Sequence, residues 1–470
     1  MKFFKSVLAL TIMLLPLSAR AELSADELHQ RSIERHAIEA AIWGMPAVNY
    51  DLMLQEMINK TKGKTNQIVY WSRLLDAKNQ TLTPNPDSIY LIPFFNTKDV
   101  GPIVIEVPPA DGAGSINGTI MDVWQTPLED VGPAGADKGK GGKYLILPPG
   151  YKEKAPEGYI VLPFNTNQGY ALMRSILNSG SQEAAAKGVE YGRRIKLYPL
   201  SQAENPPETV YVDAADLVYD ATIQYDFRFF ESLNRIIQEE SWLTRDKIMI
   251  DYLKSIGIEK GKPFNPDDKT KAILNAAMSE VHAFFEKKYE TFLQEPFFDG
   301  SRWGLPASID QINEAGAGYT APDFYPIEDR GVVYTYAFFA PKHLGQGQFY
   351  LMTIKDKDGQ DLSGSNTYRL NVPAKAPVRL YWSATAYDRA THALIHDQTR
   401  VSRASISPGL QKNKDGSVDI FFGPKAPEGK ETNWVATDPK GEFEILFRLY
   451  GPEKALFEKT WKLPDLEKTN

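Results

Sequence analysis

The stretch from Asn366 to Leu394, NTYRLNVPAKAPVRLYWSATAYDRATHAL, decides the fold class of this chain. A β-type run at 368–372 is followed by a proline-bounded turn at 373–377 and a second run at 378–386. Side chains alternate along the second run, which predicts a strand with one face in a core and one polar face. The core face is expected to carry Leu380, Trp382 and Ala384, and the polar face Arg379, Tyr381, Ser383 and Thr385.

Further short runs on both sides of this stretch predict a second sheet packed on the first. They lie at 332–339, 349–354, 417–422, 442–449 and 457–463, and Asp-Gly pairs at 358–359 and 415–416 mark hairpin turns. Short strands separated by turns are typical of a β-sandwich or a jelly roll. We therefore expect one such domain at 331–470.

The earlier part of the chain predicts a second β domain and a helical segment. Short apolar runs between 67 and 198 indicate a sandwich or open barrel, interrupted by one helix at 169–177. Helical periodicity is expected at 213–237, 244–256 and 265–292. A capping box at Ser24 to Glu27 starts an N-terminal helix, Gly44-Met45-Pro46 is expected to break it, and a second helix follows at 48–60.

These patterns predict an α+β multidomain protein with two antiparallel β-sandwich or jelly-roll-like domains and a helical segment between them. The expected order is a signal peptide at 1–21, N-terminal helices at 22–63 and a β domain at 64–212. A helical domain at 213–296, a connector at 297–330 and a β-sandwich domain at 331–470 complete the chain.

Three separated motifs carry a resemblance to a known family. They are NPDSIY at 85–90, the opening stretch at 366–394, and FEILFRLYGP at 443–452. In this order they resemble the bacterial proteins that pair a DUF1254 domain with a DUF1214 domain, over nearly all of the mature chain. The resemblance implies a DUF1254-like domain at 64–212 and a DUF1214-like domain at 331–470, and it implies no particular reaction.

The first residues, MKFFKSVLALTIMLLPLSARA, have the layout of a secretory signal peptide. Lys2 and Lys5 precede an apolar run at 7–17, and Ala19-Arg20-Ala21 forms an A-x-A cleavage site. The apolar run is too short to span a membrane. We expect cleavage after Ala21 and a periplasmic or secreted protein without a transmembrane anchor.

The expected mature chain is acidic and lacks cysteine. Removing the three basic residues of the signal peptide leaves 50 basic against 60 acidic residues, a formal charge of −10. This excess disfavours nucleic acid and anionic membranes as partners. The absence of cysteine excludes thiol catalysis and cysteine-ligated metals. We predict no cofactor, and the sequence leaves homo-oligomerisation open.

The usual catalytic signatures are missing from the sequence. It contains no G-x-S-x-G elbow, H-E-x-x-H helix, phosphate loop or G-x-G-x-x-G turn. His392 and His396 are four residues apart and would share one face of a helix, with Asp388 and Asp397 close by. This segment follows a strand, so its helicity stays open, and we predict no metal site.

In the first β domain, the segment Thr83 to Tyr90, TPNPDSIY, is the strongest candidate for chemistry. Its prolines rigidify a loop that presents Asn85 and Asp87, and Tyr90 begins the next strand. The N-x-D-[ST]-x-Y pattern is a hallmark of the resembling family. Asp87 and Tyr90 are candidates for proton transfer, and Asn85 and Trp124 for ligand binding. The alternative is an Asx turn that only starts the strand.

The second β domain contributes arginines next to aromatic surface. Guanidinium groups form planar forks that suit carboxylate or phosphate and also stack on rings. The alternative is an Arg–Asp network that clamps the sheet edge to its loops, such as Asp388 with Arg400. The candidates for ligand binding here are Arg369, Trp382, Tyr387, Asp388, Arg400 and Arg448.

Two hypotheses for function follow from these candidates. One is an exported enzyme or ligand-processing protein that acts on a small organic molecule, with an apolar body and an anionic group, in a cleft between the β domains. The other is a non-catalytic ligand-binding or envelope-associated protein that uses the same cleft. The 23 Tyr, 23 Phe and 8 Trp residues favour an apolar cleft in both cases.

Overall fold

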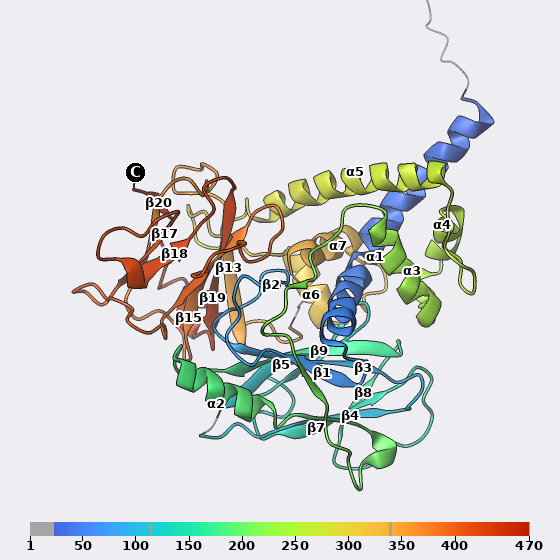
Figure 1. The fold of residues 1–470 in the computed structure, drawn as a ribbon, viewed down its shortest axis with the longest axis horizontal. Coiled ribbons are helices and arrows are strands. Elements are labelled where there is room, and N and C mark those ends of the chain that lie inside the picture. The colour runs from blue at the N-terminus through green and yellow to red at the C-terminus, as the bar shows by residue number, and fades with distance from the viewer. Residues whose placement is uncertain (1–22, 113, 338–340, 470) are drawn as a thin grey trace, which may run out of the picture.

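The computed structural model describes residues 23–112, 114–337 and 341–469. It is a mixed α+β protein with helices and two groups of β-sheets (Figure 1). The expected signal peptide at 1–21 lies outside the described residues. No helix in the described ranges is long and apolar enough to cross a membrane.

The first β domain is built around a six-stranded sheet in the order β11-β1-β3-β9-β5-β6. A four-stranded sheet, β10-β4-β7-β8, packs on it through a shared core, with helix α2 (Gln182–Gly192) at the edge. The strands of these sheets are β1 (Gln67–Tyr70), β3 (Ile89–Asn96), β4 (Ile103–Val107), β5 (Ser115–Asp122), β6 (Pro127–Val131), β7 (Gly142–Leu147), β8 (Ile160–Pro163), β9 (Gln168–Ile176), β10 (Lys196–Pro199) and β11 (Tyr211–Asp213). A separate pair joins β2 (Asn79–Gln80) to β12 (Tyr219–Asp220).

The expected helix at 169–177 is wrong, because this segment is the central strand β9. It pairs with β3 on one side and β5 on the other, and all of its residues are buried. A strand buried on both faces has no polar–apolar alternation, so the sequence lacks the period of two that identifies strands. At Gly169 a Cβ would come within 2.5 Å of the Met121 carbonyl oxygen, so this glycine allows close strand packing.

The second β domain consists of two four-stranded sheets that enclose one core. Their orders are β13-β19-β15-β16 and β18-β17-β14-β20. The strands are β13 (Gln348–Thr353), β14 (Tyr368–Val372), β15 (Trp382–Asp388), β16 (Ser402–Ala404), β17 (Val418–Gly423), β18 (Trp434–Ala436), β19 (Phe443–Tyr450) and β20 (Glu467–Lys468). Most neighbouring strands are antiparallel as expected, but four pairs are parallel, namely β1–β11, β2–β12, β7–β8 and β17–β18. A jelly-roll topology stays a prediction.

Strand β15 places the two faces of the opening stretch in two different environments. Trp382 and Ala384 lie in the sandwich core as expected, whereas Leu380 precedes the strand and is 48% exposed. The polar face, with Tyr381, Ser383 and Thr385, is also buried. It is covered by the first β domain, so this strand is buried on both sides.

Most of the helices form one cluster beside the second β domain, and α6 and α7 lie where the two β domains meet (Figure 1). Helix α1 packs on α3, α4, α5 and α7. The helices are α1 (Ala25–Thr61), α3 (Arg228–Glu239), α4 (Met249–Ser255), α5 (Asp268–Phe292), α6 (Ile309–Gly316), α7 (Ile327–Tyr336) and α8 (Lys454–Phe457). Single 3-10 turns are Leu200–Gln202, Thr244–Asp246 and Glu431–Asn433.

The predicted capping box of α1 is confirmed, since the Ser24 hydroxyl accepts from the Glu27 N–H and the Glu27 carboxylate accepts from the Ser24 N–H. The predicted break at Gly44 to Pro46 is wrong, and α1 continues through it. A Cβ on Gly44 would lie 2.9 Å from the Leu233 side chain. The glycine therefore serves the contact with α3 and does not end the helix.

Three further predictions of local structure are wrong. The run at 332–339 is described up to 337 and contains the end of helix α7, whose residues 330–336 are buried on every side and so lack helical amphipathicity. The run at 457–463 is not a strand. The helix expected from 213 begins only at Arg228, because β12 pairs with β2 before it. The expected connector at 297–330 contains α6 and the start of α7.

Candidate functional site

The loop before β3 joins the two β domains. Asn85 is fully buried, and its side-chain amide donates to the hydroxyls of Tyr381 and Tyr450, both at 2.9 Å. Those two rings stack with their centroids 4.6 Å apart. The Tyr387 hydroxyl donates to the Pro84 carbonyl at 2.6 Å. The TPNPDSIY segment therefore packs on the face of the β13-β19-β15 sheet that points away from the sandwich core.

Each β domain contributes one arginine beside a tyrosine on the neighbouring strand. Tyr90 on β3 is opposite Arg174 on β9, and the Arg174 guanidinium lies 5.0 Å from the Tyr90 ring centre. Tyr350 on β13 is opposite Arg448 on β19, at 5.4 Å by the same measure. Arg174 is 4% exposed and Arg448 is 2% exposed. The interface between the domains thus holds two buried cations.

These two pairs line a cavity of about 110 Å³. Its walls come from β3 and β9 of the first domain, from β13 and β19 of the second, and from α6 and α7. An apolar cavity of about 150 Å³ holds a benzene molecule, so this one encloses a group of similar or slightly smaller size. Its apolar lining includes Leu82, Leu172, Leu305, Ile312, Val333, Leu344, Phe349, Met352 and Leu446.

Arg448 forms no direct ion pair with a described residue, and the buried Asp87 carboxylate interacts with it only at longer range. Its terminal nitrogens donate to the Thr385 hydroxyl at 3.1 Å and to the Thr83 and Pro84 carbonyls at 2.7 and 3.3 Å. Its Nε is buried without a hydrogen-bond partner. Burial alone would lower the pKa of Arg448, but nearby tyrosines, Tyr387 first, raise this pKa above its ordinary value. The side chain is therefore a fixed cation.

Other polar groups at the cavity also have incomplete hydrogen bonding within the described part of the chain. Gln311 Oε1 is buried and forms no hydrogen bond, and the buried Tyr350 hydroxyl interacts with the Tyr450 hydroxyl without a well-directed hydrogen bond. The Gln311 amide nitrogen donates to the Tyr319 hydroxyl at 2.7 Å. The Tyr90 hydroxyl accepts from the Asn85 N–H at 2.9 Å, which leaves its own proton available. Unsatisfied buried polar groups of this kind are costly unless a ligand or water binds them.

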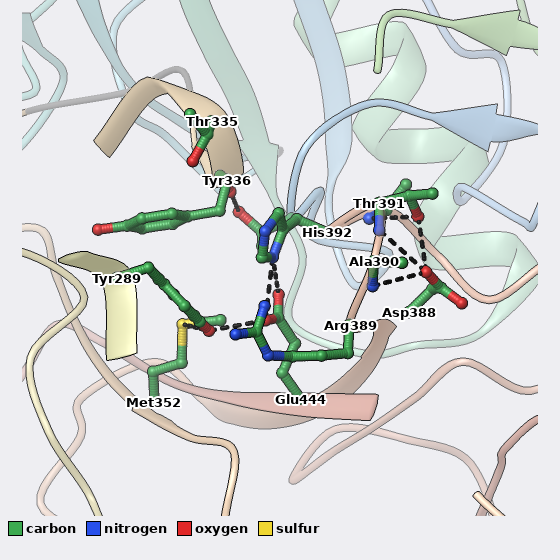
Figure 2. Close-up of polar contacts among 12 residues, drawn as sticks. Tyr289, Thr335, Tyr336, Met352, Asp388, Arg389, Ala390, Thr391, His392 and Glu444 are labelled. Carbon is green, nitrogen blue, oxygen red and sulfur yellow. Dashed lines mark hydrogen bonds and ion pairs between the residues drawn. The ribbon is translucent and has the colours of Figure 1, made fainter. Parts of the chain in front are cut away.

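A second polar cluster lies behind the cavity wall, around His392 (Figure 2). Figure 2 shows His392 and Tyr289 converging on Glu444. The His392 Nδ1 lies 3.0 Å from both carboxylate oxygens of Glu444, and its Nε2 lies 3.3 Å from Glu286 Oε1. The Tyr289 hydroxyl donates to Glu444 at 2.6 Å, and Arg389 pairs with Glu286 at 2.7 Å.

His392 is protonated in this cluster at neutral pH. Burial would lower its pKa, but the two carboxylates raise the pKa of His392 to about 9. The cluster touches the cavity wall through two lining residues, because Tyr289 contacts the Met352 sulfur and the Tyr336 ring. None of its charged residues lines the cavity itself. It therefore ties α5 to strand β19 and the loop after β15.

The structure brings together some of the residues predicted from the first domain. Tyr90 lines the cavity, and Asn85 holds the Tyr90 hydroxyl through its backbone. Asp87 does not line the cavity; its carboxylate accepts from the Ser402 hydroxyl at 2.7 Å, and burial raises the pKa of Asp87. Trp124 lies in the helical core, with its ring 4.5 Å from that of Trp43.

Of the residues predicted from the second domain, Arg448 lines the cavity and Tyr387 lies beside it. The other four have separate environments. Arg369 pairs with Glu467 at 2.6 Å on a solvent-facing strand, and Trp382 stacks on Phe447 in the sandwich core. The carboxylate of Asp388 accepts from the loop at 390–391, and Arg400 donates to the Glu431 carbonyl, so the suggested Asp388–Arg400 pair does not form.

Several site residues were not predicted from the sequence. Arg174 lies in the run ALMRSI, where a cation within an apolar segment is a signal of a buried charge, but the segment was assigned to a helix. Tyr350, Gln311 and Gln348 had no signal, because each is one of many such residues. His392 was noted as a metal ligand candidate, whereas Glu286 and Glu444 were not connected with it. In the described ranges no group of three or more His, Asp or Glu side chains has the arrangement of a metal site.

Comparisons with known proteins agree with this two-domain organisation. The family model of DUF1254, a protein of unknown function, matches residues 65–199, and that of DUF1214, also of unknown function, matches residues 347–454. Together the two matches cover about half of the chain. The chain therefore contains a DUF1254 domain followed by a DUF1214 domain.

One of two similar solved structures shares the fold. The VPA0106 protein from Vibrio parahaemolyticus is similar with a TM-score of 0.56 and 17% sequence identity, over 93% of this chain and 100% of that chain. An uncharacterized protein from Burkholderia cenocepacia gives a TM-score of 0.40 and 10% identity, over 94% of each chain. None of the curated proteins matches the sequence. The cavity between the two domains is thus the feature from which a function is argued.

Proposed function

We propose that the protein binds a small organic molecule with an apolar body and an anionic group, in the cavity between its DUF1254 and DUF1214 domains. The observation that carries this proposal is Arg448, a buried cation that forms no direct ion pair with a described residue and lines a mostly apolar cavity. Moving an isolated charge out of water costs several kcal/mol unless an opposite charge or hydrogen bonds offset it. A ligand carboxylate or similar anion supplies both.

Arg174 of the first β domain and Arg448 of the second both line the cavity. The pKa of both arginines is affected by the same tyrosines, which include Tyr90, Tyr350 and Tyr450. Both guanidinium groups line the same cavity, and we infer that a single anionic group binds between the domains. Binding would then depend on both domains together.

Thermal shift with small carboxylic acids, benzoate and hexanoate among them, tests this proposal. Arg448→Met removes the cation, and Tyr350→Phe removes a hydroxyl that forms no well-directed hydrogen bond in the described protein. Tyr350→Phe should unfold at the wild-type temperature without ligand, yet gain less on addition of acid. Arg369→Ala, at an exposed ion pair far from the cavity lining, is the control and should respond fully.

If Arg448→Met and Tyr350→Phe both respond to the acids as strongly as the wild type, the anionic group does not bind here and the proposal fails. Arg448→Met also removes three hydrogen bonds and lowers stability, so a weaker response of this variant alone could reflect its fold. Tyr350→Phe provides the second, independent test.

Two functions share this binding step. The first is chemical processing of the ligand. Tyr90 favours this function, because this residue lines the cavity beside Arg174 and its hydroxyl proton is available for donation. A tyrosine in this position acts as a general acid. Binding without turnover is the second. Incubation with a pool of small organic acids, followed by mass spectrometry, separates them: Tyr90→Phe abolishes any conversion in the first case, and the wild type converts nothing in the second.

We also propose that the protein is exported, which rests on the predicted signal peptide at 1–21. Cell fractionation and N-terminal sequencing test this. A mature chain that begins at Glu22 supports export, and a cytoplasmic chain that keeps Met1 overturns it.

A further inference from the structure

The cavity has a second polar region, formed by two glutamine side chains. Gln348 begins β13 and is 5% exposed, and it borders both this cavity and a smaller neighbouring one. Its amide forms no hydrogen bond with another described side chain and keeps some accessible surface. Gln311 lies on α6, is 2% exposed and has an unpartnered Oε1. Both line the cavity. Buried amides normally have hydrogen-bond partners, so two incompletely bonded amides at one cavity indicate a polar group on the ligand.

The arginines and glutamines come from four elements, of which β13 and β19 are neighbouring strands. Arg174 and Arg448 belong to strands β9 and β19, whereas Gln311 belongs to helix α6 and Gln348 to the first residue of β13. Apolar side chains such as Ile312, Leu172 and Leu446 make up the rest of the lining. The chemistry of the two regions also differs, because guanidinium groups only donate hydrogen bonds, whereas amides both donate and accept.

We propose that the ligand is a bifunctional acid, with a carboxylate bound by the arginines and a hydroxyl group bound by the glutamine amides, joined by a short apolar segment. This inference rests on the proposed function and names the class of its ligand. A hydroxyl suits the amides because it donates to Oε1 and accepts from the amide nitrogen. The cavity volume of about 110 Å³ restricts the enclosed ligand to roughly the size of a monocyclic or short-chain hydroxy acid.

Matched ligand pairs test this inference. Benzoate is compared with 4-hydroxybenzoate, and hexanoate with 6-hydroxyhexanoate, by isothermal titration calorimetry on the full mature chain. A net hydrogen bond to the hydroxyl predicts that at least one hydroxy acid binds about three- to tenfold more tightly than its parent. A series of ω-hydroxy acids from four to eight carbons should show one optimal length, set by the spacing of the two polar regions.

Two variants connect this preference with the glutamines. Gln348→Met keeps the side-chain volume and loses no hydrogen bond to another described side chain, so the fold should be unaffected. It should bind the parent acids as the wild type does and lose the preference for the hydroxy acids. Gln311→Met should do the same, with some loss of stability because it also loses the bond to Tyr319. Arg448→Met should weaken the binding of both members of each pair.

The outcomes separate this inference from the proposed function. If parent and hydroxy acids bind equally, and both depend on Arg448, the ligand class is wrong and the anion site stands. If the preference exists but persists in both glutamine variants, the hydroxyl binds elsewhere and the inference is overturned. If no acid of either pair binds, or if binding is unchanged in Arg448→Met and Tyr350→Phe, the proposed function fails and the inference fails with it.

Discussion

Replacing His392 by glutamine should remove a pH-dependent part of the stability. In the folded protein, Glu444 and Glu286 flank the imidazole, and Tyr289 and Arg389 complete its polar surroundings. The pKa of His392 rises from an ordinary 6.5 to about 9 despite the burial that opposes it. Each tenfold change in proton affinity corresponds to about 1.4 kcal/mol, so protonation of the cluster stabilises the fold by about 3 kcal/mol.

The sign of the pH dependence follows from the direction of this change. Since the pKa is higher in the folded than in the unfolded chain, the stabilisation is fully present below pH 6.5. It decreases as the pH rises and is lost above about pH 9. The difference in unfolding free energy between the wild type and His392→Gln should therefore be about 3 kcal/mol larger at pH 6 than at pH 10.

Chemical denaturation at pH 6, 8 and 10 measures this difference directly. Lysines and tyrosines elsewhere also titrate at high pH, but they do so in both proteins and cancel in the comparison. His282→Gln is the matched control. His282 lies on α5 four positions before Glu286, and burial lowers the pKa of His282. Its effect should not grow toward low pH. An equal wild-type advantage over His392→Gln at pH 6 and pH 10 would refute the assignment of a protonated imidazole.

Two further predictions concern single side chains. Gly331→Ala should lower the unfolding free energy by about 1–3 kcal/mol, because the added Cβ meets the Ile42 carbonyl oxygen at 2.7 Å where α7 crosses α1. Gly112→Ala is the control, since no atom lies within 4 Å of its added Cβ. Equal denaturation midpoints for Gly331→Ala and the wild type would contradict this prediction. Asp87→Asn should keep the ligand response. Burial raises the pKa of Asp87, so ionising this carboxyl at higher pH destabilises the folded wild type, and the stability of the variant relative to the wild type should rise from pH 4 to pH 7. A pH-independent difference in unfolding free energy would exclude this.

The sequence predicts those parts of the fold in which one face meets water. The capping box at Ser24, helix α5 and strands β14 and β17 of the second domain all have a polar side that sets the period of the pattern. The sequence-based prediction fails for β9 and α7. Both are buried on all sides, so their apolar residues repeat neither every second residue nor every 3.6 residues. Parallel pairs such as β1–β11 are also absent from the prediction, because they join segments far apart in the chain.

The candidate site was predictable only where a motif marks it. Tyr90 and Arg448 were singled out and do line the cavity, because each lies in a motif of the resembling family. Arg174 was missed, since the strand that carries it was assigned to a helix. Gln311 and Gln348 become candidates only when α6 and β13 meet, which no local pattern indicates. Conversely, Arg369 has the residue type expected of an anion site but a surface position.

The TPNPDSIY loop explains why the two β domains act as one unit at the cavity. Its Thr83 and Pro84 carbonyls accept from the Arg448 guanidinium of the DUF1214 domain, and its Asn85 N–H donates to the Tyr90 hydroxyl of the DUF1254 domain. One short segment thus sets the position of a cation on one wall and of a hydroxyl on the other. Its two prolines restrict the backbone, so this position is largely fixed before any ligand binds. The polar groups of the motif hold the residues that line the cavity, and the chemistry we propose belongs to those residues.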